Sequence, residues 1–125
     1  MSTPVWVFGN PDLEIDALPI ALMPEFERRY PHLAFSVHDP NEDFDMPEHL
    51  LIIDTVQGID RVTTFDSIEA FADTPHVTMH DFDLGMKLKW LAKLKKLPPF
   101  TLIGVPMGGE RELVLAQLEP ILGRR

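Results

Sequence analysis

The sequence contains no cysteine among its 125 residues. This absence excludes disulfide bonds, zinc sites built on thiolates, thioester chemistry and redox-active cysteine pairs. Any metal ion bound by this chain must therefore be held by carboxylate oxygen and imidazole nitrogen. The search for a metal site narrows to Asp, Glu and the five His residues.

Basic residues are also scarce, because 11 Lys and Arg stand against 20 Asp and Glu and give a net charge of −9. Proteins bind a phosphate backbone mainly through Lys and Arg, so no nucleic-acid partner is expected. No apolar stretch approaches the roughly 20 residues of a membrane-spanning helix, and the N-terminus lacks the basic and apolar regions of a signal peptide. We expect a cytoplasmic protein without a membrane partner.

Length and composition indicate one globular domain that spans residues 1–125. The hydrophobic content of 45% and the charged content of 25% are typical of a chain with a packed core. Short apolar runs alternate with helical patterns. The predicted strands are 4–8, 33–37, 50–53, 61–65, 76–79 and 100–105, and the predicted helices are 19–30, 82–97 and 110–122.

Most of these strands are apolar at every position, which is typical of strands buried on both faces. The alternation predicts an α/β fold, a three-layer αβα sandwich around a mostly parallel sheet of about five strands. Pro24 lies close to the start of the first helix, where it is tolerated or introduces a kink.

The helix predicted at 82–97 has the clearest periodicity in the chain. Its apolar side chains recur at helical spacing and are expected to face the sheet: Leu84, Leu88, Leu91 and Leu94, widened by Met86, Trp90 and Leu97. Lysines lie opposite this stripe. They fit a solvated helix face, or a surface that attracts an acidic partner.

Ligands of parallel α/β sheets bind beyond the carboxyl ends of the strands, so polar residues that follow strands are the candidates. Asp54 directly follows L-L-I-I, where a carboxylate is costly without a cation or hydrogen-bond donors, and it either caps a loop or has a function. Asp16 fits the N-cap of the first helix or a ligand. His80 fits a hydrogen bond at the entry to the long helix, or a ligand. The other histidines, including His38, are expected on the surface or in loops.

Three segments in order, V-W-V-F-G-N-P-D-L-E-I-D, L-L-I-I-D-T-V-Q-G and V-T-M-H-D-F-D-L, resemble the hydrogenase maturation protease family. These endopeptidases trim the large subunit of nickel-iron hydrogenases. In that family an acid follows the Gly-Asn-Pro turn, and it matches Asp16. A second acid ends the central strand and matches Asp54, and a histidine precedes a leucine-rich helix and matches His80.

The resemblance implies that Asp16, Asp54 and His80 form a nickel-recognition site, with Asn10 in contact with the substrate. Two carboxylates and one imidazole suit a borderline divalent metal and leave coordination positions open. Nickel would arrive with the hydrogenase large-subunit precursor, and no organic cofactor is expected. The implied activity is removal of the precursor's C-terminal peptide.

Two non-catalytic alternatives come from other classes. A receiver-like signalling domain would use Asp54 as its phosphoacceptor. That family, however, has an acid pair after the first strand and a lysine after the last, where this chain has G-N-P and V-P-M. The second alternative is an α/β protein-interaction domain whose acidic face meets a basic partner.

Overall fold

The computed structural model describes residues 3–9, 17–38, 47–67 and 79–123, and for residues 79–85 it describes the backbone alone. The strands are β1 (Thr3–Val7), β2 (Leu33–Val37), β3 (Leu50–Val56), β4 (Thr63–Phe65) and β5 (Phe100–Pro106). The helices are α1 (Leu18–Ala21), α2 (Met23–Arg29), α4 (Met79–Lys93) and α5 (Arg111–Leu122).

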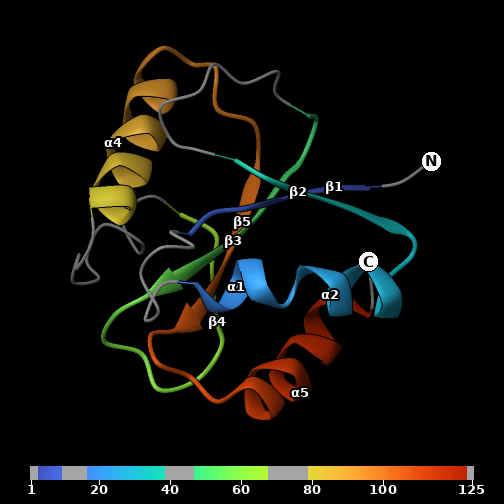
Figure 1. The fold of residues 1–125 in the computed structure, drawn as a ribbon. Helices are drawn as coiled ribbons and strands as arrows, with labels where there is room; N and C mark the ends of the chain where they lie inside the picture. The colour runs from blue at the N-terminus through green and yellow to red at the C-terminus, as the bar shows by residue number, and fades with distance from the viewer. Residues whose placement is uncertain (1–2, 10–16, 39–46, 68–78, 124–125) are drawn as a thin grey trace.

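The five strands form one sheet in the order β2-β1-β3-β5-β4. All neighbouring pairs are parallel except β4 and β5, which are antiparallel. Helices α1, α2 and α5 cover one face of the sheet and α4 covers the other (Figure 1). The predicted αβα sandwich with a mostly parallel sheet is therefore confirmed.

Strand β3 lies at the centre of the sheet, and all seven of its residues are buried. Side chains alternate between the two faces of a strand. Leu51 and Ile53 pack with α2 and α5, whereas Leu50 and Ile52 pack with α4. The alternation places Asp54, which follows Ile53, on the face that α4 covers.

The helix predicted at 19–30 is divided into α1 and α2. Pro24 has no N–H to donate to the carbonyl of Ile20, and its ring crowds that carbonyl. The chain bends at Leu22, and Pro24 becomes the second residue of the new helix, a position where proline is well tolerated. Pro24 was expected to be tolerated or to kink the helix, and the structure has two helices, α1 and α2, at this point.

Helix α4 begins at Met79, earlier than the predicted start at residue 82, and ends at Lys93. Residues 76–78 of the predicted strand 76–79 lie outside the described residues, and Met79 is helical. Leu88 and Leu91 face the core as expected. Met86, Trp90 and Leu94 do not, because they are exposed. The broad inward stripe was therefore wrong: in the side chains described from residue 86 onward, the buried stripe is narrow. No helix in the described ranges has both the length and the apolar character to cross a membrane.

Tyr30 connects α2 with α5. Its ring is buried, and its hydroxyl donates a hydrogen bond of 2.6 Å to Glu119 Oε2. Burial, and then this hydrogen bond, raise the pKa of Tyr30 above its ordinary value of 10.0. The tyrosinate is therefore less favourable in the folded protein than in the unfolded chain.

The pKa of Tyr30 predicts a loss of stability at high pH. The folded state has the higher pKa, so its stabilising effect is complete below about pH 10 and declines as pH rises above that value. Tyr30→Phe is expected to lower the free energy of unfolding by about 1 kcal/mol at pH 7, since one hydrogen bond is lost. Urea unfolding at pH 8 and pH 11 should show this difference shrinking or reversing at pH 11; an unchanged difference would contradict the assignment.

Candidate functional site

Asp54 lies within β3 rather than after it. The predicted strand ends at Ile53, but the observed strand continues through Thr55 and Val56, which pair with Val105 and Pro106 of β5. The extension has a local cause, because both added residues are β-branched and favour extended backbone. Asp54 is consequently a residue of the sheet.

The carboxyl group of Asp54 is almost completely buried, with a relative exposure of 1%. Its Oδ1 accepts a hydrogen bond of 2.9 Å from the backbone N–H of Thr55. Placing a carboxylate on the central strand of a sheet costs several kcal/mol of desolvation, which a leucine at this position would avoid. Asp54 is therefore a candidate for a functional rather than a stabilising role.

A row of residues crosses the sheet at the level of Asp54. Asp54 pairs with Gly104 of β5, which in turn pairs with Thr63 of β4. On the other side, Phe8 N donates to Ile53 O (2.8 Å) and His38 N donates to Val7 O (3.0 Å). Val7 pairs with Ile53 of β3 and with Val37 of β2. Continuing both parallel registers by one residue places Phe8 beside Asp54 and His38 beside Phe8.

His38 is a polar residue of this face that the sequence analysis left among the surface and loop histidines. It is only half-exposed, and its ring stacks on Trp6 with centroids 4.4 Å apart and planes inclined by 26°. Its Nε2 lies 2.8 Å from Ser36 Oγ, within hydrogen-bond distance. The sequence did contain a pattern that indicates a position at the ligand-binding edge, since His38 directly follows the predicted strand 33–37.

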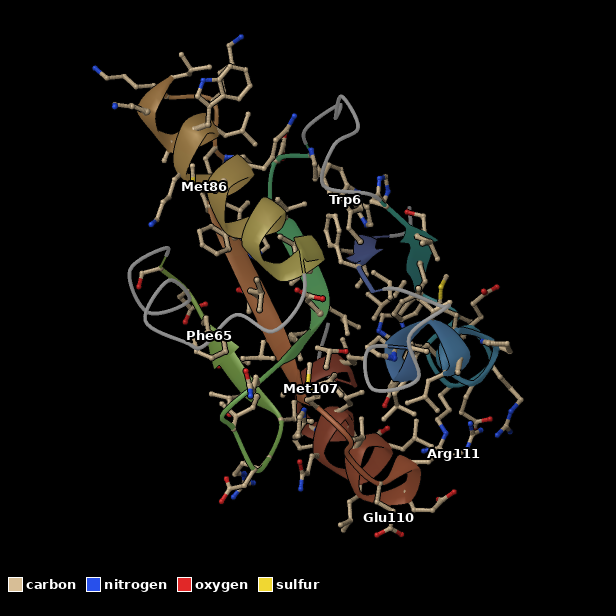
Figure 2. All side chains as sticks on the ribbon, turned by 60° about the vertical axis from the view of Figure 1, so that its left-hand side comes forward. Trp6, Phe65, Met86, Met107, Glu110 and Arg111 are labelled. Carbon is tan, nitrogen blue, oxygen red and sulfur yellow. The ribbon has the colours of Figure 1, made fainter. Side chains whose placement is uncertain are left out.

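Gly104 leaves no space for a side chain beside Asp54. A Cβ at this position would lie 2.9 Å from Val56 Cγ2, 3.0 Å from Phe65 Cε2 and 3.2 Å from Ile59 Cδ1. These three side chains fill the space beside Gly104 toward β4. Phe65 is seen on β4 at this edge of the molecule in Figure 2. The packing beside Asp54 toward β4 therefore requires glycine at position 104.

The first turn of α4 lies toward the same edge of the sheet as the carboxyl ends of β3 and β5 (Figure 1). The sequence had indicated that His80 precedes the helix. In the structure it is the second residue of α4 and therefore lies inside the helix. Its position in the chain fits a ligand or a hydrogen-bonding residue at the helix entry. The structure describes its backbone but not its side chain.

Asp16 and Asn10 lie outside the described residues, in the connection between β1 and α1. Among the side chains that the structure does describe, no group of three or more His, Asp and Glu could hold a metal ion. Of the predicted triad, Asp54 alone is among these described side chains. The joint site of Asp16, Asp54 and His80 therefore stays a prediction.

A comparison with protein-family models finds no match for this chain, and neither does a comparison with curated proteins. Solved structures do match. The hydrogenase maturating endopeptidase HybD from Escherichia coli has a TM-score of 0.70 at 22% identity, over 99% of this chain and 89% of that one. An endopeptidase from Escherichia coli, known from a solution structure, has a TM-score of 0.64 at 20% identity, over 98% of this chain and 89% of that one.

A third structure, an uncharacterised protein from Wolinella succinogenes, has a TM-score of 0.55 at 14% identity, over 99% of this chain and 94% of that one. Together these likenesses show that the chain has the fold of the hydrogenase maturating endopeptidase. The resemblance found in the sequence is confirmed at the level of the fold, over nearly the whole chain.

The receiver-like alternative is not favoured by this fold. Receiver domains have the doubly wound strand order 2-1-3-4-5. Here β5 lies next to β3, and β4 is an antiparallel edge strand. Asp54 therefore does not follow the third strand of a receiver sheet.

Proposed function

We propose that this protein is an endopeptidase that recognises nickel in a hydrogenase large-subunit precursor and removes the precursor's C-terminal peptide. The observation that carries the proposal is the buried carboxylate of Asp54, held on the central strand of a fold shared with a hydrogenase maturating endopeptidase. A buried acid at the ligand-binding edge of an α/β sheet is typical of a functional site.

The proposed nickel ligands are Asp16, Asp54 and His80. In the sequence Asp16 follows β1, Asp54 belongs to β3 and His80 belongs to α4. Nickel is part of the substrate in this scheme, because it enters bound to the precursor. Carboxylate and imidazole ligands suit a borderline divalent ion, and three protein ligands leave positions for groups from the precursor. Since the chain has no cysteine, any thiolate at the metal must come from the precursor.

The position of Asp54 supports this role on physical grounds. A carboxylate in a low-dielectric environment attracts a cation more strongly than one in water. Its Oδ1 is held by the Thr55 N–H, which fixes the orientation of the carboxylate plane. Asn10, which follows β1, is the proposed substrate contact.

The test is to incubate the protein with a nickel-loaded hydrogenase large-subunit precursor and to follow the mass of the precursor. We expect the loss of a C-terminal peptide from the nickel-loaded form and no change in a precursor that has been stripped of nickel by a chelator. Asp16→Asn and His80→Ala are expected to abolish the cleavage. Equal cleavage of the nickel-free precursor, or an unchanged mass of the nickel-loaded one, would contradict the proposal.

A further inference from the structure

Three exposed apolar side chains form a ridge along α4 and the turn that follows it. Met86 is 52% exposed, Trp90 is 56% exposed and Leu94 is 45% exposed. We call these three residues the α4 ridge. They recur every four residues, so they lie one above another on a single side of the helix.

The helix geometry turns this ridge away from the sheet. Leu88 is buried against the sheet and anchors the inner side of α4. Successive residues of an α-helix are separated by about 100°, so Met86 and Trp90 lie nearly opposite Leu88. Figure 2 shows α4, which carries Met86, as the outer layer on one side of the sheet, far from α5 with Arg111 on the other.

The ridge has basic residues on both sides. The Nζ of Lys87 lies 5.6 Å from the centroid of the Trp90 ring, a cation–π distance. Lys89 and Lys93 are exposed on the other flank, four residues apart, where like charges repel each other.

The same charge continues past the helix end. Residues 86–97 contain five lysines and no acid, in a chain whose net charge is −9. Lys95 adopts a positive φ of 59° at the helix end, a position that ordinarily takes glycine. All five lysines of the chain therefore lie in this segment, and Lys95 stands where local stability favours another residue.

From this surface we infer that the α4 ridge and its lysines are the docking surface for the precursor protein, which they contact through an acidic segment that carries apolar side chains. This inference rests on the proposed function, since it names where that substrate binds outside the cleavage site. Tryptophan and methionine are enriched at the centres of protein interfaces, and a surrounding ring of charges selects partners of opposite sign.

The location of the ridge suits this role. Helix α4 has His80 in its first turn, and Met86 follows about 9 Å farther along the helix axis. A protein bound along the ridge would therefore approach the proposed nickel site from one end of the helix.

Charge and shape favour an acidic protein over the other occupants of such a surface. The five lysines of residues 86–97 attract an acidic segment at short range, and the ridge adds apolar contacts that a phosphate backbone does not use. The three residues of the α4 ridge form a narrow line, whereas helices that lie in a membrane present a broad apolar face.

The experiment compares the wild-type protein with Trp90→Ala and with the double variant Lys89→Glu/Lys93→Glu, using the nickel-loaded precursor as the probe. We expect each variant to raise the KM for precursor cleavage by about tenfold to thirtyfold while kcat stays close to wild type. Fluorescence anisotropy of labelled precursor should show the same loss of affinity. Affinity of the wild type should fall with added salt, as expected for a charged interface.

Two control variants separate docking from general surface effects. Leu113→Ala removes a side chain that is as exposed as Trp90, at 56%, but lies on α5 across the sheet. Lys89→Arg/Lys93→Arg keeps the charge. Both controls are expected to keep the wild-type KM, and circular dichroism should show that all variants are folded.

The outcomes distinguish the docking surface from the proposed function. If the wild type binds the precursor through Trp90 but never changes its mass, the docking surface stands and the proposed cleavage fails. If the wild type cleaves and Trp90→Ala keeps the wild-type KM, the docking surface is wrong. Two further outcomes would also overturn the docking surface, if Trp90→Ala leaves the affinity for the precursor unchanged. Loss of binding to vesicles of phosphatidylglycerol and phosphatidylcholine in this variant would indicate a lipid partner. Loss of self-association in sedimentation would indicate a second copy of the chain.

Discussion

Asp54→Asn is expected to lower the rate of precursor cleavage by at least about 100-fold while the protein remains folded. The amide has the shape of the carboxylate and keeps an oxygen that can accept the Thr55 N–H bond of 2.9 Å. It lacks the negative charge. If Asp54 serves to bind a cation, this one change removes the attraction and leaves the packing of β3 intact.

The free energy of unfolding provides the second half of this prediction. A charge buried at 1% exposure is costly for folding, so its removal is expected to leave stability within about 1 kcal/mol of wild type, or to raise it. Urea unfolding and the mass assay on nickel-loaded precursor measure the two quantities separately. A folded variant that cleaves at the wild-type rate would remove Asp54 from the site.

Thr55→Val is the matched control for Asp54→Asn. Thr55 is the next residue on β3, is equally buried, and by alternation lies on the opposite face of the sheet. Among the described residues its Oγ1 has no hydrogen-bond partner. Valine has nearly the same shape, so we expect unchanged cleavage and equal or slightly higher stability.

Gly104→Val is expected to destabilise the fold by about 3 kcal/mol, the largest effect on stability among our predictions. A Cβ at this position would lie 2.9 Å from Val56 Cγ2 and 3.0 Å from Phe65 Cε2, closer than side chains normally approach. Val56 belongs to the central strand and moves little. The new side chain must therefore displace Phe65 or separate β5 from its neighbours.

Thermal and urea unfolding of Gly104→Val measure this effect, which corresponds to a fall in Tm on the order of 10 °C. Phe65→Leu in the same chain should recover part of the loss, because it makes room where the clash occurs. The recovery appears as a coupling free energy in the double-mutant cycle. A stability of Gly104→Val equal to wild type would show that Val56, Phe65 and Ile59 can rearrange without cost.

The order of the elements and the layered fold could be predicted from the sequence alone. Apolar runs such as L-L-I-I and T-L-I-G-V must be buried on both faces, and helical patterns between them must cover a sheet. Periodicity and burial are local consequences of side-chain chemistry, so the sequence contains them directly. The missing N–H of Pro24 predicts a disturbance of the first helix, but not that the helix would divide into α1 and α2.

The lateral arrangement of the strands could not be predicted in this way. The antiparallel pairing of β4 with β5 depends on contacts between residues far apart in the chain, such as Thr63 with Gly104. The same applies to His38, whose stacking on Trp6 requires β1 and β2 to be neighbours. Helical periodicity identified the apolar residues of α4 but not which of them the sheet would leave exposed.

By itself, then, the sequence determined the αβα architecture and the oxygen and nitrogen character of any metal ligand, because these follow from periodicity and from the absence of cysteine. Only the tertiary structure decided that Asp54 is buried within a strand, that Gly104 must lack a side chain, and that Trp90 faces solvent. The physical reason is the same in all three cases. Burial and exposure are set by the neighbours that packing supplies, and those neighbours come from distant parts of the chain.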